Sequence, residues 1–440
     1  MNRLIIYLII GSLFKLNSFA QDSTFYTLEA LVEQGLNSNY DVRLSELSER
    51  ASMEDLKTAR EAFYPNLYGN VSNNLSFGRY IDPYTYLYSN QSNYYNAASL
   101  NSNVVLYQGS KNINALKAAK SKLEYSKLTR EARILMMKEN ITIAFININL
   151  LKALIANNGE RLKLSNEEQV RMDQLYQSGK INKTVLLDLS TQKALVETEQ
   201  IELQRRLTNE SLRLGLLIGD KPLDITRLDS LNIDLQAPLD SSSYRVTNHP
   251  EYQQQLMNVR YYYSRMNVAK SALSPVLSLN GTIYSGYSNN RLRFDNAGKS
   301  IDYPFPTQFS DNFYQLVSLN LSIPFYSNRI NKNIKRQAMI TYQISEVEKE
   351  KRLQELNNLF QWEYQLITTS FDQVKITQQK TNDLQQAFEL VQVQFFAGRI
   401  GSFEYIYRKQ QFFEGKALLI NDKYTFALNN KLFELHFGKK

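Results

Sequence analysis

The sequence predicts an internally duplicated α+β membrane protein, and three features of the chain carry this prediction. Two stretches, residues 109–177 and 328–396, have the apolar periodicity of helices and contain no proline. Each stretch follows a pair of segments in which apolar and polar residues alternate, as they do in β-strands. The same order of elements occurs twice along the chain, which indicates an internal duplication.

The composition is that of a folded, exported protein. The chain has 440 residues, 43% of them hydrophobic, and no cysteine, so its stability must come from packing and assembly rather than from disulfides. The net charge of +8 is small for this length, and the basic residues are interleaved with acidic ones. A nucleic-acid partner is therefore not indicated.

Residues 1–20 are predicted to be a secretory signal peptide. Arg3 supplies the positive start, residues 4–14 form an apolar core, and Ser18-Phe19-Ala20 has the small residues of a cleavage site. The alternative is a buried N-terminal helix. No run of eighteen apolar residues follows, so a membrane-spanning helix is not expected, whereas the alternating pattern of a β-barrel wall would escape this test.

The first repeat, residues 21–247, begins with a predicted helix over residues 27–63 that ends before Pro65. Two strands are predicted next, over residues 66–80 and 98–107. In both, hydrophobic residues alternate with Asn or Ser, so each strand has one apolar and one polar face. The loop between the strands is rich in tyrosine and fits an aromatic girdle at a membrane surface, although tyrosine also favours strands without a membrane.

A very long helix is predicted over residues 109–177. At the usual rise per residue it would be about 100 Å long, longer than ordinary globular domains hold. A break around Gly179 follows, then a return helix over residues 183–218, and the short turn makes the two helices antiparallel neighbours. A connector over residues 219–247 completes the repeat. On the long helix alone, a coiled-coil rod that acts only as a spacer is an equal alternative.

The second repeat, residues 248–440, has the same order of elements after an initial helix. Equivalent residues lie 219 positions apart from the end of the second strand onward, as Asn112 and Asn331 do. Before the first strand the offset is 210, so the nine extra residues lie within the strand-loop-strand unit of the second repeat. The predicted elements are strands over 276–288 and 313–326, a long helix over 328–396 and a return helix over 402–436.

The four predicted strands are long enough to cross a bilayer at a tilt. Four strands cannot close a barrel, and an open sheet edge in lipid leaves backbone groups without hydrogen-bond partners. Several chains must therefore share their strands. Three chains would supply twelve strands, enough for a barrel with a wet lumen, and their helices would continue it as a hollow tube.

Taken together, these features resemble the TolC-like outer-membrane efflux proteins, or outer membrane factors. The resemblance rests on the proline before the first strand of each pair, the strand endings Val105-Leu106-Tyr107 and Ile323-Pro324-Phe325-Tyr326, and the hairpins at Gly179 and Gly398. It covers essentially the whole mature chain. It implies a homotrimeric channel with a twelve-stranded outer-membrane β-barrel, four strands per chain, that continues into a long periplasmic α-helical coiled-coil barrel.

The resemblance also implies partners: a periplasmic adaptor (membrane fusion protein), an inner-membrane transporter of RND or ABC type, and outer-membrane lipid. The chain would be a passive exit duct for small molecules or proteins. Drug or metal efflux and type I secretion share this architecture, and the sequence does not choose between them. The alternative is a periplasmic coiled-coil structural or adaptor protein that spans no membrane, against which the four alternating strands argue.

In this family the two hairpins form the periplasmic tip, where the adaptor docks. Glycines at these positions also end their helices in a left-handed conformation, so a structural role accompanies the functional one. The corresponding residues of this chain are Gly179, Lys180, Ile181, Gly398, Arg399 and Ile400.

The family commonly carries acidic residues after the second hairpin, which line the closed lumen. Glu404 occupies the first such position, Tyr407 stands where a second acid often occurs, and Asp188 is the equivalent of Tyr407 in the first hairpin. Three copies of Glu404 around the axis of a trimer would form a constriction that attracts cations. The simpler alternative is that Glu404 is a solvated helix residue.

No catalytic, cofactor-binding or metal-binding residues are predicted, and an enzyme is not expected. The only two histidines, His249 and His436, are far apart in the sequence, and His249 stands at a predicted helix start. Without cysteine or clustered His and acidic residues, the chain shows no nucleophile or metal constellation. It also has no glycine-rich phosphate-binding loop.

Overall fold

The computed structural model describes residues 26–81, 86–90, 92–219, 225–236 and 245–438. The predicted signal peptide, part of the tyrosine-rich loop and part of the connector lie outside these residues. The chain divides into two compact units. The helical unit comprises Met1–Arg43, Ala132–Val246 and Asn357–Lys440, and the strand unit comprises Leu44–Glu131 and Thr247–Leu356. Each unit therefore contains parts of both sequence repeats.

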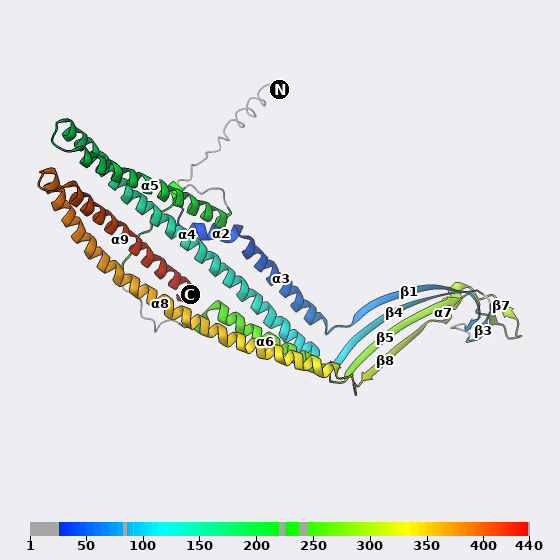
Figure 1. Ribbon diagram of the computed structural model, residues 1–440. Coiled ribbons are helices and arrows are strands. Elements are labelled where there is room, and N and C mark those ends of the chain that lie inside the picture. The colour runs from blue at the N-terminus through cyan, green and yellow to red at the C-terminus, as the bar shows by residue number, and fades with distance from the viewer. Residues whose placement is uncertain (1–25, 82–85, 91, 220–224, 237–244, 439–440) are drawn as a thin grey trace, which may run out of the picture. The chain divides into compact units, whose positions relative to one another are not determined.

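The strand unit is built on one antiparallel sheet of four strands, in the order β1-β4-β5-β8 (Figure 1). The first two strands come from the first repeat and the last two from the second. Both outer strands, β1 and β8, have one edge that pairs with no other strand among the described residues. The strands are β1 (Asn66–Ser76), β4 (Asn93–Gln108), β5 (Val276–Ser288) and β8 (Tyr314–Ser322).

The sheet has one apolar and one polar face, as the alternation predicts. Leu100 lies opposite Ile283 on the apolar face, where Val71 and Val317 are 77% and 75% exposed. On the polar face, side-chain hydrogen bonds link neighbouring strands, for example between Thr282 Oγ1 and Asn101 Oδ1 at 3.1 Å. None of the four strands contains a charged residue. The sheet therefore exposes a continuous uncharged, apolar surface.

The strand bounds differ from the predicted ones for local reasons. β1 ends at Ser76 rather than at residue 80, because Gly78 adopts a φ of 99° that interrupts extended backbone. β8 ends at Ser322 rather than at residue 326, since Pro324 has no N–H to donate to a neighbouring strand. β4 begins at Asn93, so Tyr94 and Tyr95, expected in the loop, belong to the strand.

One residue of β4 is skipped in the pairing with β5. Val105 pairs with Ser278 and Tyr107 with Leu277, which leaves Leu106 between them without a partner. Such a bulge adds one residue to one strand and bends it. The alternation expected over residues 98–107 therefore ends at Val105.

Residues 289–311, which are expected from the sequence to form an irregular loop, contain two short strands and a helix. β6 (Arg293–Phe294) pairs with β7 (Ser300–Ile301), and the short helix α7 (Phe305–Asp311) follows. The buried Gln308 side chain accepts a hydrogen bond from Ser288 N and donates one to Ser288 O, at 3.1 and 3.0 Å. α7 thus covers the edge of β5 beyond the start of β8, a side-chain contact that periodicity does not reveal. In the first repeat, β2 (Tyr80–Ile81) and β3 (Tyr88–Ser89) form a similar short pair.

Helices account for the rest of the fold. The initial helix of the first repeat is split at Asn39, whose side-chain oxygen accepts a hydrogen bond from Asp41 N at 2.8 Å and so starts the second helix. α3, α4 and α8 contribute residues to both units. The helices are α2 (Leu28–Ser38), α3 (Tyr40–Glu61), α4 (Lys111–Gln177), α5 (Lys183–Ile218), α6 (Pro250–Ser271), α8 (Ile330–Phe396) and α9 (Ser402–Phe437).

The two junctions between strand and long helix have the same backbone. Gly109 and Ser110 before α4 have φ values of 54° and 62°, and Asn328 and Arg329 before α8 have 47° and 63°. These pairs lie 219 positions apart, the offset expected from the sequence. A side chain at Gly109 would also meet the Ser274 hydroxyl at 2.3 Å, so glycine is required there for space as well.

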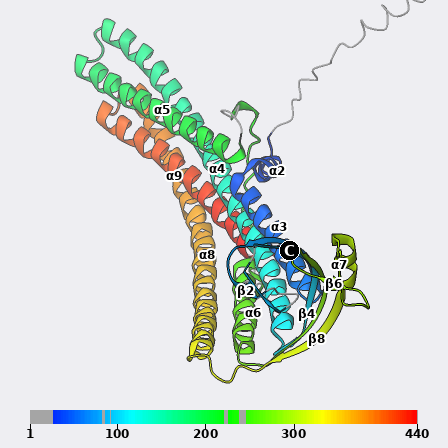
Figure 2. The same cartoon turned by 90° about the vertical axis from the view of Figure 1, so that its right-hand side faces the viewer.

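The helical unit contains two hairpins, in which α5 lies along α4 and α9 lies along α8 (Figures 1 and 2). The core of the α4–α5 hairpin is aliphatic, and α2 packs against it through the fully buried Leu31. The core of the α8–α9 hairpin is aromatic, with Phe360, Phe433 and Phe437 in mutual ring contact. Burial of these seams is what holds the helices together.

One described helix, α4, is long and apolar enough in an eighteen-residue window to cross a membrane by length and composition alone. Half of that window is buried within the chain, and Ile141, Ala144 and Ile148 are fully buried in the aliphatic core. A core helix of this kind passes the same test, so packing against α2 and α5 accounts for its hydropathy.

Candidate functional site

The two hairpin tips have the same hydrogen-bonded geometry. Gly179 and Gly398 both have a φ of 73°, which is left-handed backbone. In the first tip Lys180 N donates to Leu175 O, and in the second Arg399 N donates to Gln394 O, both at 2.9 Å. These six-residue closures satisfy carbonyls at the helix end, and glycine suits the left-handed position that they require.

Each tip presents one basic side chain to solvent. Lys180 and Arg399 are exposed, and the isoleucines that follow them are half-buried. A side chain added at either tip glycine would meet no atom within 4 Å. The predicted docking residues thus lie at the accessible ends of both hairpins. The two glycines are required there by their left-handed backbone conformation and not by a lack of space for a side chain.

Of the predicted aperture residues, Asp188 is the one that links the two hairpins. Its carboxylate accepts a hydrogen bond from Ser402 Oγ at 3.4 Å, at the first residue of α9. Glu404 is exposed in the first turn of α9 and has no ammonium or guanidinium partner among the described residues. Tyr407 is 48% exposed, stacks on Phe403 and accepts a hydrogen bond from Gln411 Nε2 at 2.8 Å.

A buried polar cluster that the sequence analysis did not predict lies between α4 and α9. The Glu168 carboxylate accepts hydrogen bonds from the Tyr405 hydroxyl and the Lys409 ammonium, and Lys409 Nζ also donates to Ser165 Oγ at 2.9 Å. All four residues are buried, Tyr405 and Glu168 at 0% and 2% exposure. The cluster therefore fixes the start of the second return helix to the first long helix.

The burial of this cluster shifts the pKa values of its members. Burial lowers the pKa of the Lys409 ammonium, and the Glu168 carboxylate opposes this effect. Burial, followed by the charge of Glu168 and the hydrogen bond to it, raises the pKa of the Tyr405 hydroxyl, which stays protonated as a donor. A buried carboxylate with two donors and an ammonium partner is satisfied only while all of them are in place.

The spacing of residues along α9 could have indicated this cluster. Tyr405 and Lys409 lie eight and four residues before Phe413, which belongs to the apolar seam of α9. Residues four apart share one face of a helix, so the seam extended toward the tip contains Lys409. A lysine on a buried face calls for an anionic partner, although the sequence does not show which helix supplies it.

A second buried ionisable cluster lies near the C-terminal end of α9. His436 Nδ1 is 2.7 Å from Glu363 Oε1 on α8, and His436 Nε2 is 3.5 Å from Glu139 Oε2 on α4. Burial lowers the pKa of His436, but the hydrogen bonds and charges of Glu139 and Glu363 outweigh it and raise the pKa to about 9. His249, the other histidine, caps α6 by accepting a hydrogen bond from Glu251 N.

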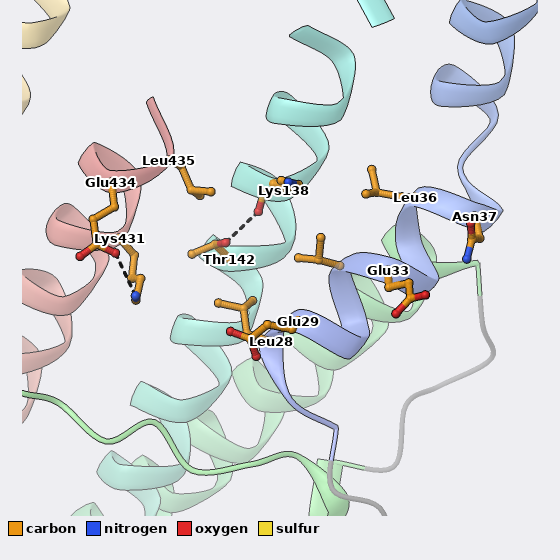
Figure 3. A pocket seen from close by; sticks show the side chains of 11 residues that line it. Leu28, Glu29, Glu33, Leu36, Asn37, Lys138, Thr142, Lys431, Glu434 and Leu435 are labelled. Atoms are coloured by element: carbon orange, nitrogen blue, oxygen red, sulfur yellow. Dashed lines mark hydrogen bonds and ion pairs between the residues drawn. The ribbon is translucent and has the colours of Figure 1, made fainter. Parts of the chain in front are cut away.

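A cavity of about 600 Å³ lies between α2, α4 and the end of α9 (Figure 3). Leu28, Leu36 and Leu435 contribute apolar walls. At its rim Lys431 Nζ pairs with Glu434 Oε2 at 2.9 Å. The described residues hold no group of three or more His, Cys, Asp or Glu arranged to bind a metal.

Two features stand out among the described residues: long hairpins with exposed tips in the helical unit, and a sheet with an exposed uncharged face in the strand unit. The model of the outer membrane efflux protein family matches residues 31–220 and 246–430. The chain belongs to the outer membrane efflux protein family.

Solved structures of outer-membrane channels have the same fold. VceC of Vibrio cholerae is 16% identical over 94% of this chain and 97% of its own, with a TM-score of 0.81. CmeC of Campylobacter jejuni is 16% identical over 93% of this chain and 85% of its own, with a TM-score of 0.80. MtrE of Neisseria gonorrhoeae, solved in an open state, is 15% identical over 93% of this chain and 89% of its own, with a TM-score of 0.76. No curated protein sequence matches the chain.

These comparisons confirm the predicted family, fold class, function and location. The chain is an outer-membrane exit duct whose long helices lie in the periplasm, and the alternative of a scaffold that spans no membrane is not supported. The family is one of channels and not of enzymes.

Proposed function

We propose that three copies of this chain form one channel. The observation that carries this proposal is the four-stranded sheet, which has no charged residue and an exposed apolar face. In the part of the chain that the structure describes, its two outer edges are open. An open edge is not tolerated in lipid, so β8 of one copy pairs with β1 of the next. Three four-stranded sheets then close a twelve-stranded barrel, with the Asn- and Ser-rich face around a wet lumen.

The hairpin tips are the docking surface for a periplasmic adaptor in this proposal. Gly179, Lys180 and Ile181 form one contact and Gly398, Arg399 and Ile400 the other. Support comes from the exposure of both tips and from their matching backbone. The adaptor connects the duct to an inner-membrane transporter that supplies the energy, while this chain performs no bond chemistry. The family description names efflux, which supports an export role without naming the cargo.

The start of α9 acts as the aperture. Glu404 projects from its first turn and would place three carboxylates around the trimer axis, which attract cations. Asp188 and Tyr407 lie in the same region of the helical unit, and Asp188 contacts Ser402. Opening requires α9 to move away from the axis when the adaptor engages the tips.

A reversible cross-link tests this function. Because the chain has no cysteine, Arg399→Cys places one thiol per copy at the second tip. Joining these thiols between neighbouring copies should stop export from living cells, and reducing the link should restore it. Full export with the cross-link in place would contradict the gating role of the tip.

A matched pair of substitutions tests the orientation of the sheet. Val317→Lys places a charge on the apolar face of β8, and Ser318→Lys places it on the opposite face. A lysine facing lipid near the bilayer centre costs about 2–4 kcal/mol, whereas one in a wet lumen costs little. Membrane assembly should therefore fail only for Val317→Lys, and equal assembly of both variants would contradict the lumen assignment.

A further inference from the structure

A pocket of about 410 Å³ lies in the strand unit between α4, α6 and α8. Its size is that of a site for a small molecule or a lipid headgroup. α6 is in contact with both other helices: Gln254 Nε2 donates to Thr129 Oγ1 of α4 at 2.7 Å, and Tyr263 packs edge-on against Tyr342 of α8. The residues that line the pocket come from three helices of one chain.

Three cations line this pocket without a counterion. Lys117 and Lys120 come from α4 and Arg260 from α6, and none of them has a carboxylate oxygen within 4 Å among the described residues. Some other cations of the same unit are paired, as Arg130 is with Glu49 at 3.4 Å. Three unpaired cations around one cavity leave a site whose charge is complementary to an anion.

Acidic residues are scarce in the segments around the pocket, where Glu346 accepts a hydrogen bond from the Tyr342 hydroxyl. Residues 109–123, 256–275 and 327–345 contain eleven Lys or Arg and no Asp or Glu. These are the parts of α4, α6 and α8 that lie nearest in the chain to the strands. The positive charge is therefore a property of all three helices at this end of the strand unit.

The other walls of the pocket suit an amphipathic ligand. The Tyr263 and Tyr342 rings lie 5.6 Å apart and, with Val259, form an apolar side. The Tyr342 hydroxyl donates to Glu346 at 2.6 Å, so its ring is held in place. Lys117 lies about 9 Å along α4 from the first residue of that helix, and its flexible stem can extend toward the strands.

We propose that this pocket binds a phosphate group carried by an anionic lipid of the membrane around the strands. Lys117, Lys120 and Arg260 contact the phosphate oxygens, and the tyrosine pair and Val259 receive the apolar part of the headgroup region. The lipid source rests on the membrane-spanning role of the sheet, whereas the affinity for phosphate rests on the three unpaired cations. Bound lipid would anchor the three helices at the membrane surface.

Native mass spectrometry of the full chain in detergent tests this proposal. The probes are short-chain phosphatidylglycerol, phosphatidylcholine of the same chain length, and inorganic phosphate in equilibrium dialysis. The pocket variant combines Lys117→Gln, Lys120→Gln and Arg260→Gln. A matched control removes three charges outside the pocket through Lys111→Gln, Lys332→Gln and Lys335→Gln. Each variant is first checked for the oligomeric size of the unmodified protein, so that failed assembly is told apart from lost binding.

The unmodified protein should retain phosphatidylglycerol in preference to phosphatidylcholine, and the pocket variant should bind it roughly a hundredfold more weakly. The control variant should bind as the unmodified protein does. Comparable binding of inorganic phosphate, lost in the same variant, would support a phosphate site and assign it to a soluble ligand instead of a lipid. Equal phosphatidylglycerol binding by the pocket and control variants would overturn the proposal, with the channel function unaffected.

Discussion

The two helical hairpins share one backbone design but differ in what is buried in their seams. In the α8–α9 hairpin, Glu363 and His436 form a buried hydrogen bond of 2.7 Å. The residues 219 positions earlier, in the α4–α5 hairpin, are Ala144 and Leu217, which belong to the aliphatic core. The duplication thus keeps helix lengths and turns while one copy carries an ionisable pair and the other an apolar contact.

The same difference recurs near the tips. Tyr405 and Lys409 of α9 correspond to Leu186 and Ser190 of α5, and α5 has no buried charged residue. Apolar packing is non-directional, whereas a buried ion pair with hydrogen bonds has one satisfied geometry. α9 is therefore held in a defined register on α4 and α8 at two points along its length, and the comparison can be tested by removing each point.

Loss of the Lys409 ammonium should have the largest effect. Lys409→Met keeps the shape of the side chain but leaves the Glu168 carboxylate buried without its cation, which costs about 3–5 kcal/mol. Hydrogen exchange of the α9 amides, measured in the detergent-solubilised protein, should become faster. The increase should match the rise in the opening equilibrium that corresponds to this free energy. The amides of α5 should be unchanged, because α5 contains no part of this cluster.

Lys416→Met is the matched control for this change. Lys416 pairs with Glu160 between the same two helices, but the side chains are 33% and 63% exposed. An exposed pair contributes about 0–1 kcal/mol. A further change of Glu168→Gln in the Lys409→Met variant should restore much of the protection, since it removes the buried charge. Equal effects of Lys409→Met and Lys416→Met would show that burial does not distinguish the two pairs.

The second point of attachment should depend on pH. His436 has its pKa raised from 6.5 to about 9 in the folded protein, so its charged form stabilises the fold. That contribution is fully present below pH 6.5 and is lost as the pH rises through about 9, with an upper size of about 3 kcal/mol. The groups that face the imidazole are Glu139 on α4 and Glu363 on α8. Hydrogen exchange at the end of α9 should accelerate across this pH range.

The first repeat supplies the control for the pH effect. Glu363→Ala with His436→Leu copies the Ala144 and Leu217 pair into the second hairpin. In this variant, hydrogen-exchange protection at the end of α9 should no longer change between pH 6.5 and 9, whatever the overall stability of the variant. A pH dependence that persists in it would assign the effect to other groups.

The elements were predictable from the sequence to the extent that periodicity and turn chemistry determine them. The return helix over residues 183–218 and the strand over 276–288 have the predicted bounds. Gly219 follows the helix, Pro275 precedes the strand, and the apolar patterns within both are strict. α7 and the bulge at Leu106 were not predicted. Both depend on a single side chain or residue that meets another part of the chain, such as Gln308 on Ser288.

The residues of the candidate site also fall into those that the sequence predicts and those that only the packing of the helices identifies. Gly179 and Gly398 were predictable because a left-handed residue at a helix end has a sequence signature. The partners of Lys409 and His436 were not, since Glu168 and Glu363 look like solvated residues on their own helices. Only the packing of one helix on another identifies which carboxylates are buried.

The tip glycines should give a smaller effect that is equal in both hairpins. Gly179→Ala and Gly398→Ala each place a side chain at a φ of 73°, where a residue with a Cβ costs about 1–2 kcal/mol. Hydrogen exchange around each tip should report this local loss. Gly159→Ala is the control, because it lies within α4 with free space around it and should stabilise the helix by about 0.5–1 kcal/mol. Unequal effects at the two tips would contradict their equivalence.

The smallest effect should come from the asparagines that begin the long helices. Asn112 Nδ2 donates to Ala62 O at the end of the helix before β1, and Asn331 Nδ2 donates to Ala272 O before β5, both at 3.0 Å. Each bond ties a long helix to the helix that precedes the strand pair of its own repeat. Replacing either asparagine by alanine should cost about 1 kcal/mol, the usual net value of such a bond.

This last pair tests how far the duplication extends. If the repeats differ only in their buried seams, the free energies of unfolding of Asn112→Ala and Asn331→Ala should fall by the same amount, and the losses should add in the double variant because the two sites share no partner. The comparison uses urea unfolding in detergent. A clear inequality would show that the repeats also differ in stability at the strand junctions, where their backbones are the same.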